Sequence, residues 1–184
     1  MTRVWDVTQV VAPGVWVWPG DRAYDCGWTW RMRDGASCNV GQIAMSCHTG
    51  THIDAPYHFA ETGATVEKAP LLACLGPCRV LPLERVAEAA GEERVLVRAG
   101  GAAPTVAQIG GLPGLRLFGI DGPSVDPMDS RTLDAHHALW HKGAVILEGL
   151  DLTAVPDGRY DLIALPLRLA GMDAAPVRAL LREL

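Results

Sequence analysis

The sequence predicts a mixed α/β domain built around a sizeable β-sheet. Many short runs are apolar throughout or alternate between apolar and polar residues, and both patterns indicate strands. Helix signals are few, and there is no internal repeat or low-complexity tract. Many strands with few helices favour an α/β fold with a central mixed sheet. A length of 184 residues without a clear linker predicts one domain over residues 1–184, with two small domains as the alternative.

The predicted strands cover residues 4–7, 15–18, 39–46, 78–83, 94–98, 115–120, 144–147 and 160–165. Pro19, Gly20 and Asp21 predict a turn after the second of these strands. The third strand leads the chain to His48.

Three helices are predicted. The clearest covers residues 132–142, with Ser130 as a possible N-cap and Gly143 as a C-terminal stop. Residues 84–90 predict a short helix, and the last segment, with Pro176 in its first turn, predicts a helix that runs to the C-terminus. The Gly/Ala/Pro-rich stretch 100–114 predicts a surface loop.

Composition excludes some classes of function. The net charge of −5 offers no basic surface for nucleic acid or anionic membranes, so neither is expected as a partner. The chain has no apolar run long enough to span a membrane, and its N-terminus lacks a signal-peptide pattern. Five cysteines without a CxxC pair indicate reduced thiols in a cytoplasmic protein.

The most informative stretch is residues 48–58, which holds His48, His52, Asp54 and His58. A glycine, a proline and β-branched residues favour an extended or looped backbone over a helix. Alternate side chains of an extended segment share a face, which puts His52, Asp54 and, less securely, His58 on one side. Two imidazoles and a carboxylate suit a cation such as Zn²⁺ or Mn²⁺, so the stretch predicts a metal site.

Further ligands must come from other elements. Glu148 closes an apolar strand, where an unpaired buried charge would be costly, so a functional role is favoured over a structural ion pair. His136 on the predicted helix is the other candidate. His137 and His141 are spaced i, i+4 and fit either a second site or, the favoured reading, a solvated helix face.

Four other residues have two readings each. Asp121 and Asp126 follow a strand, where a capped turn explains them adequately and a role near the site is the alternative. Trp18 is either a core aromatic or a platform for an aromatic ligand. Cys47 is adjacent to His48, but a small buried thiol is favoured over a metal ligand.

Several motifs together resemble one family. The segment His-Thr-Gly-Thr-His-Ile-Asp-Ala-Pro-Tyr-His-Phe at 48–59 resembles the signature of the cyclase-like metal-dependent hydrolases. Other segments are similar to the bacterial kynurenine formamidase (arylformamidase) branch: Trp-Pro-Gly-Asp at 18–21, Gly-Ile-Asp-Gly-Pro-Ser-Val-Asp-Pro at 119–127, Leu-Asp-Ala-His-His-Ala-Leu at 133–139, Ile-Leu-Glu-Gly-Leu at 146–150 and Leu-Ile-Ala-Leu-Pro-Leu-Arg-Leu-Ala-Gly at 162–171. The resemblance covers nearly the whole chain.

The resemblance implies a binuclear site for divalent ions, usually zinc, with manganese and cobalt as alternatives. His48, His52 and Asp54 would bind one ion, and Asp54 would also reach the second. His136 and Glu148 would complete the ligand set of the second ion. The choice of His136 over its neighbour rests on the family's twelve-residue spacing to Glu148.

The resemblance also implies an activity. His58 would be the catalytic acid/base, and Trp18 would contact the substrate. The reaction would be hydrolysis of N-formyl-L-kynurenine to L-kynurenine and formate in tryptophan breakdown. The implied fold is a twisted sheet of the swivelling β/β/α type, assembled as homodimers or larger homo-oligomers.

One departure and two alternatives remain. Between Arg98 and Leu115 the chain is shorter than the family pattern, and all the implied site residues lie outside that region. An isatin-hydrolase-like enzyme of the same superfamily would share the metal motif. A non-catalytic metal-binding oligomeric protein would share it too, but would have no need for His58.

Overall fold

The structure, a computed structural model, describes residues 2–184. Within them a nine-stranded mixed sheet forms the body. Its strands lie in the order β1 (Val4–Asp6), β11 (Leu180–Glu183), β9 (Gly158–Ile163), β5 (Leu75–Pro82), β6 (Arg94–Arg98), β7 (Leu117–Ile120), β8 (Val145–Glu148), β4 (His52–Asp54) and β10 (Ala174–Pro176). This mixed α/β architecture confirms the predicted fold class.

The four central strands, β5 to β8, are parallel, and the strands outside them pair antiparallel. Both faces of these central strands are buried, as expected for a parallel sheet. Alternation divides them between two cores: Leu96 and Leu117 pack in one cluster, whereas Val95, Val97 and Phe118 pack in the other.

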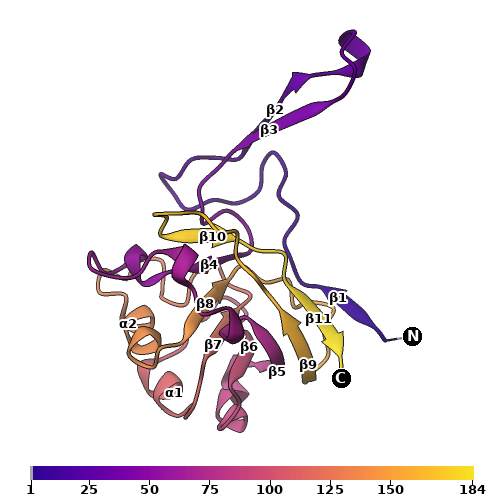
Figure 1. Cartoon of the computed structure of the whole chain (residues 1–184). Coiled ribbons are helices and arrows are strands. Elements are labelled where there is room, and N and C mark those ends of the chain that lie inside the picture. The colour runs from indigo at the N-terminus through magenta and orange to yellow at the C-terminus, as the bar shows by residue number, and fades with distance from the viewer. Residues whose placement is uncertain (1) are drawn as a thin grey trace.

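Both α-helices pack on the same face of the sheet. The second cluster includes Ile109 of α1 (Val106–Gly110), Leu139 of α2 (Asp134–His141) and Val86 of the 3₁₀ helix Leu83–Ala89. In Figure 1 both α-helices lie to the same side of the central strands. The other core lies where the sheet curls. There an isolated antiparallel bridge between Thr8 and Leu150 joins the segment after β1 to the segment after β8.

A two-stranded arm projects from this body. It consists of β2 (Asp25–Trp30) paired antiparallel with β3 (Val40–Ala44), and Figure 1 shows it standing clear of the sheet. Sequence analysis predicted β3 but not β2. The arm carries exposed Trp28, Trp30 and Ile43. Its surface is therefore unusually apolar for a ribbon that stands clear of the sheet.

Most predicted elements match the structure within a few residues, but three predictions were wrong. Residues 15–18 are not a strand: they lie between turns at 13–14 and 19–20 and pair with no strand in the described part of the chain. The predicted turn after them is confirmed by the bond from Asp21 N to Trp18 O. Residues 100–114 are not all loop: Thr105 and Gln108 form a capping box that starts α1, and Ile109 is buried.

The C-terminal segment is not a helix. It forms β10 and β11, which pair with β4 and β9. Pairing with other strands of the sheet outweighs the helix propensity of its alanine, leucine, arginine and glutamate residues, because tertiary context overrides intrinsic propensity. In the described part of the chain no helix is long and apolar enough to cross a membrane.

Two glycines meet where the loop before β4 passes the end of β8. A Cβ placed on Gly149 would lie 2.4 Å from the carbonyl oxygen of Gly50, and Gly149 has a φ of +67°. Thr51 Oγ1 also donates to the Gly149 carbonyl at 2.6 Å. The loop before β4 and the end of β8 therefore lie so close together that there is no room for a side chain at position 149.

We expect Gly149→Ala to lower the free energy of unfolding by more than the ~1–3 kcal/mol that a left-handed non-glycine residue alone costs. Gly143→Ala is the matched control, because its φ is +69° and its added Cβ would meet nothing within 4 Å. Urea denaturation of both variants measures the difference. Equal losses in the two variants would show that the close approach has no energetic weight.

Candidate active site

β4 is the strand around which the site is built. Its extended backbone puts His52 and Asp54 on one face and Ile53 on the other, where Ile53 is fully buried in the core. The antiparallel register with β8 sets His52 directly opposite Glu148. Strand pairing alone therefore brings a residue from position 148 to the stretch 48–58.

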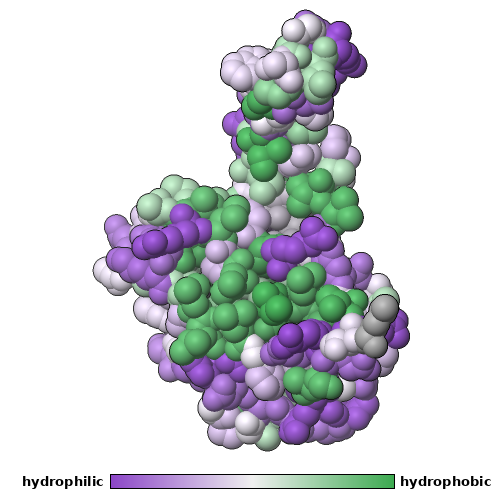
Figure 2. Space-filling model, turned by 45° about the vertical axis from the view of Figure 1, so that its right-hand side comes forward, coloured by the Kyte–Doolittle hydropathy of each residue, from purple (hydrophilic) through white to green (hydrophobic). Residues whose placement is uncertain are grey.

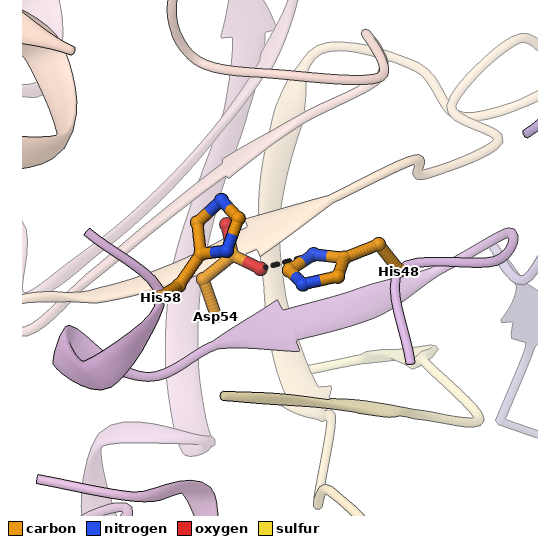
Figure 3. Close-up of side chains that lie close together, drawn as sticks. All are labelled: His48, Asp54 and His58. Atoms are coloured by element: carbon orange, nitrogen blue, oxygen red, sulfur yellow. Dashed lines mark ion pairs between the residues drawn. The ribbon is translucent and has the colours of Figure 1, made fainter. Parts of the chain in front are cut away.

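His48 and His58 flank this strand. His48 lies in the turn before β4, and His58 ends the short 3₁₀ helix Pro56–His58 that follows it. Figure 3 shows the two imidazoles on either side of the Asp54 carboxylate. The extended backbone predicted for 48–58 therefore holds for His52 to Asp54, and Pro56 ends it before His58.

Asp126 brings His136 to the site. Its carboxylate accepts from the backbone N–H groups of Ala135 and His136 at 2.9 and 3.0 Å, at the start of α2. The same carboxylate accepts from His136 Nδ1 at 2.6 Å. Ser130, the predicted cap, instead accepts from Leu133 N, one residue before the helix. Asp126 therefore caps the helix and orients its histidine with one side chain.

Two buried carboxylates lie between three imidazoles. Asp54 Oδ1 lies 3.0 Å from His48 Nδ1 and 3.3 Å from His52 Nε2, whereas its Oδ2 lies 3.4 Å from His136 Nε2. Glu148 faces His52 Nε2 at 3.5 Å through Oε2 and His136 Nε2 at 3.6 Å through Oε1. Asp54 and Glu148 thus both span the gap between His52 and His136.

In each of these three histidines, the outer ring nitrogen is the one that points away from Asp54 and Glu148. It faces an oxygen that can only accept a hydrogen bond. His52 Nδ1 faces the Gly50 carbonyl at 3.0 Å, His136 Nδ1 faces Asp126, and His48 Nε2 faces Asp173 Oδ2 at 2.9 Å. These nitrogens must therefore carry protons. The inner nitrogens are left to face the carboxylates, which is the arrangement that outer partners impose on metal-binding histidines.

Charge in the cluster is redistributed by burial and by pairing. Burial opposes the charged form of His136, but Asp126, Asp54 and Glu148 outweigh it and raise its pKa to about 9. Burial likewise opposes ionisation of Asp54, yet the surrounding imidazoles hold its pKa well below the usual range. For Glu148, burial and the nearby charge of Asp54 raise the pKa. The imidazolium groups here supply the positive charge that a bound cation would supply.

The inner atoms fit a divalent cation. His52 Nε2 and Asp54 Oδ1 are buried polar atoms without a hydrogen-bond partner. Buried polar atoms are rarely left unpaired, because desolvation is costly. Two triplets have ligand atoms mutually within 4.8 Å, namely His52, Asp54 and Glu148, and His48, Asp54 and His58. Nitrogen and carboxylate oxygen donors suit zinc, manganese or cobalt.

The cluster forms the floor of an open cleft of about 450 Å³. Trp16 and Trp18 form part of its wall and contact each other edge to face, with ring centroids 5.9 Å apart. His58 lies in the same cleft, half-exposed, and its ring centroid is 4.3 Å from that of His48. The proposed metal ligands, His58 and Trp18 therefore meet in one place, whereas Asp121 accepts from Ala99 N and does not line the cleft.

Sequence analysis missed Asp173, which lines the cleft, and undervalued Asp126, which contacts His136. Asp173, just before β10, was absent from the candidates because the segment was read as helix and the recognisable motif stops at residue 171. Asp126 was read mainly as a turn residue, although it binds His136. Cys47 lines the cleft, but neither it nor His137 belongs to the two ligand triplets.

Known proteins share this sequence and fold. The family model named Cyclase matches residues 5–111. A kynurenine formamidase of Maricaulis maris (strain MCS10) is 40% identical over an alignment of 209 positions that covers all of both chains. One of Salinibacter ruber is 42% identical and covers 97% of this chain and 96% of the relative. The first alignment has 209 positions, more than the 184 residues of this chain, which agrees with a chain that is shorter than its relatives.

Solved structures agree. A potential metal-dependent hydrolase with cyclase activity superimposes with a TM-score of 0.84 at 30% identity, covering 100% of this chain and 99% of the other. Isatin hydrolase A of Labrenzia aggregata has a TM-score of 0.80 at 24% identity, over 98% of this chain and 93% of the other, which shows a shared fold.

The sheet, and the imidazole and carboxylate cluster at its edge, define a hydrolase of the metal-dependent class. Full-length similarity narrows this class further. The chain belongs to the cyclase family, in its bacterial kynurenine formamidase branch.

Proposed function

We propose that this protein is an arylformamidase that hydrolyses N-formyl-L-kynurenine to L-kynurenine and formate. The observation that carries the proposal is the full-length identity of 40–42% to two kynurenine formamidases. The site agrees with it, because a cluster suited to divalent ions underlies a cleft with an aromatic wall.

His48, His52 and Asp54 would hold one ion, and His136 and Glu148 would hold a second that Asp54 also reaches. We propose zinc for both. Divalent ions there would lower the pKa of bound water towards ~7 and withdraw charge from the formyl oxygen. Asp126 keeps the outer nitrogen of His136 protonated, so that its inner nitrogen faces Asp54 and Glu148.

His58 would move the proton. The scissile bond joins the formyl carbon to an arylamine nitrogen, which leaves poorly as an anion and therefore needs a proton. An imidazole can take a proton from the attacking water and return it to that nitrogen as the carbon–nitrogen bond breaks. Trp18, half-buried in the wall of the cleft, would stack on the aryl ring.

A turnover assay tests the proposal. Purified protein loaded with zinc is given N-formyl-L-kynurenine, and the absorbance of kynurenine is followed. Isatin serves as the competing substrate, because the isatin hydrolase shares the fold. Faster turnover of isatin would replace the proposal with ring opening. No turnover of either substrate by metal-loaded protein would favour a non-catalytic metal-binding protein.

The metal-free protein is expected to lose stability as the pH rises through about 9. His136 has a pKa of about 9 in the fold, against an unfolded value of 6.5. Its protonated form therefore stabilises the fold fully below pH 6.5, and this contribution disappears as the pH passes 9. Urea unfolding from pH 6 to 9.5 in the presence of a chelator measures the decline.

Two samples serve as controls for this decline. Metal-loaded protein should not show it, because a ligand imidazole is already neutral. In His136→Gln it should be smaller. An unfolding midpoint of chelated wild-type protein that stays constant to pH 9.5 would contradict the assignment.

We also propose that the enzyme is a cytoplasmic homodimer or larger homo-oligomer. An isolated two-stranded ribbon is marginally stable in water, yet the side chains of Trp28 and Trp30 on the arm are 52% and 58% exposed. Figure 2 shows a further broad apolar area on the body. Exposed apolar patches of this kind mark interfaces. Five free cysteines agree with a reducing compartment.

Light scattering of the purified protein tests the assembly. A mass of at least twice 19.7 kDa supports it, and Trp30→Ser is expected to shift the population towards monomer. A wild-type protein that remains a monomer at micromolar concentration would overturn this part of the proposal.

A further inference from the structure

Asp173 lies where the C-terminal part of the chain returns to the site. Its carbonyl oxygen accepts from Ala55 N at 2.8 Å, and β10 begins at the next residue and pairs with β4. The backbone of Asp173 is thereby fixed beside the end of the strand that carries His52 and Asp54.

One carboxylate oxygen of Asp173 contacts two imidazoles. Oδ2 lies 2.9 Å from His48 Nε2 and 3.4 Å from His58 Nδ1. Because this oxygen only accepts, both nitrogens facing it must carry the proton. That leaves His48 Nδ1 to face Asp54 at 3.0 Å and makes Nε2 the basic nitrogen of His58.

A purely structural role does not account for these contacts. Within residues 2–184 the ion-pair partners of the Asp173 carboxylate are these two histidines, and no Lys or Arg approaches it. Its side chain is 38% exposed, so the carboxylate is not needed to fill the core. Instead, Asp173 fixes the rings of two histidines with different proposed tasks, because His48 would bind metal and His58 would move protons.

We propose that Asp173 is a positioning residue that couples His48 to His58, selecting with one oxygen the ring nitrogen that each presents to the reaction. The inference rests on the proposed function, because the role of His58 does. Outer-shell carboxylates of this kind change metal affinity or activity about 10–100-fold when they are removed.

The first test is Asp173→Asn, which keeps the shape and removes the charge. Zinc affinity, measured by competition with a chromogenic chelator, should weaken about 10–100-fold. At saturating zinc, kcat should fall over a similar range while KM stays within about twofold. Asp129→Asn removes the same charge from an exposed loop and should leave both quantities unchanged. Asp173→Ala is the second variant, should the amide perturb folding.

A double-mutant cycle separates the two arms of the contact. If Asp173 acts on turnover through His58, Asp173→Asn should cost kcat little in a His58→Ala background, because the group it positions is gone. The same kcat loss in both backgrounds would overturn the coupling to His58. Unchanged zinc affinity would overturn the contact with His48.

Failure of the proposed function would look different. If wild-type protein does not hydrolyse N-formyl-L-kynurenine, the assignment of the reaction fails, whereas the zinc competition still reports on Asp173 and His48. If wild type is active and Asp173→Asn matches it in both zinc affinity and kcat, only the positioning role fails.

Discussion

Replacing His58 by alanine is expected to lower kcat about 10²–10⁴-fold, the range that a positioned acid/base contributes, while zinc content stays unchanged. The ring lies beside the cluster, half-exposed in the cleft, and its contact with Asp173 leaves one nitrogen for proton transfer. The measurement is steady-state turnover of N-formyl-L-kynurenine together with zinc analysis of the same sample.

His137→Ala is the matched control for this change. It removes an imidazole of α2 that packs near Phe59 and belongs to neither ligand triplet. If His58→Ala retains full activity, His58 has no place in the mechanism. If it loses zinc instead, His58 is a ligand, as its membership of a triplet with His48 and Asp54 would permit.

Glu148→Ala is expected to abolish turnover together with zinc binding. Glu148 is buried, faces His52 and His136 through separate oxygens, and also accepts from Val125 N at 2.7 Å. Removing it deletes a proposed ligand and leaves a buried backbone N–H unpaired, which costs about 1–3 kcal/mol of stability. Zinc analysis, turnover and urea unfolding measure the three effects.

Glu148→Gln separates the ligand role from the structural one. The amide oxygen can still accept from Val125 N, so stability should largely return while zinc binding stays weak. A fully metallated Glu148→Ala protein would show that the ligand set is misassigned. Glu183→Ala, at an exposed position of β11, should change neither zinc content nor turnover.

Local sequence patterns predicted those parts of the fold that depend on local chemistry. The apolar runs at β6, β7 and β8 are buried at nearly every position, on both faces, so strand composition alone reveals them. The extended backbone of His52 to Asp54 follows from β-branched neighbours. The C-terminal strands could not be predicted this way, because only pairing with β4 and β9 makes them strands.

The site residues also divide into those that the local sequence suggests and those that only the fold brings to the site. The ligand types and their spacing in 48–58 suggest chemistry directly. The local sequence also made His136 and Glu148 candidates, and resemblance to a family implied their place in the ligand set. Asp173 has no signal of its own in the sequence, since a single aspartate two residues after a glycine fits many turns. Its importance arises from β10 pairing with β4, a contact between residues more than a hundred positions apart.

The placement of β4 between β8 and β10 has a consequence for synthesis of the chain. β4 is made early, whereas its two neighbours come from positions 145–148 and 174–176, close to the end. A nascent chain that has not yet released residues 173–184 can already pair β4 with β8, which sets Glu148 opposite His52, but β4 has no partner on its other side. Asp173 reaches His48 and His58 only with the segment that leads into β10. A truncated product would therefore carry an unpaired edge at β4 and leave both imidazoles without that carboxylate.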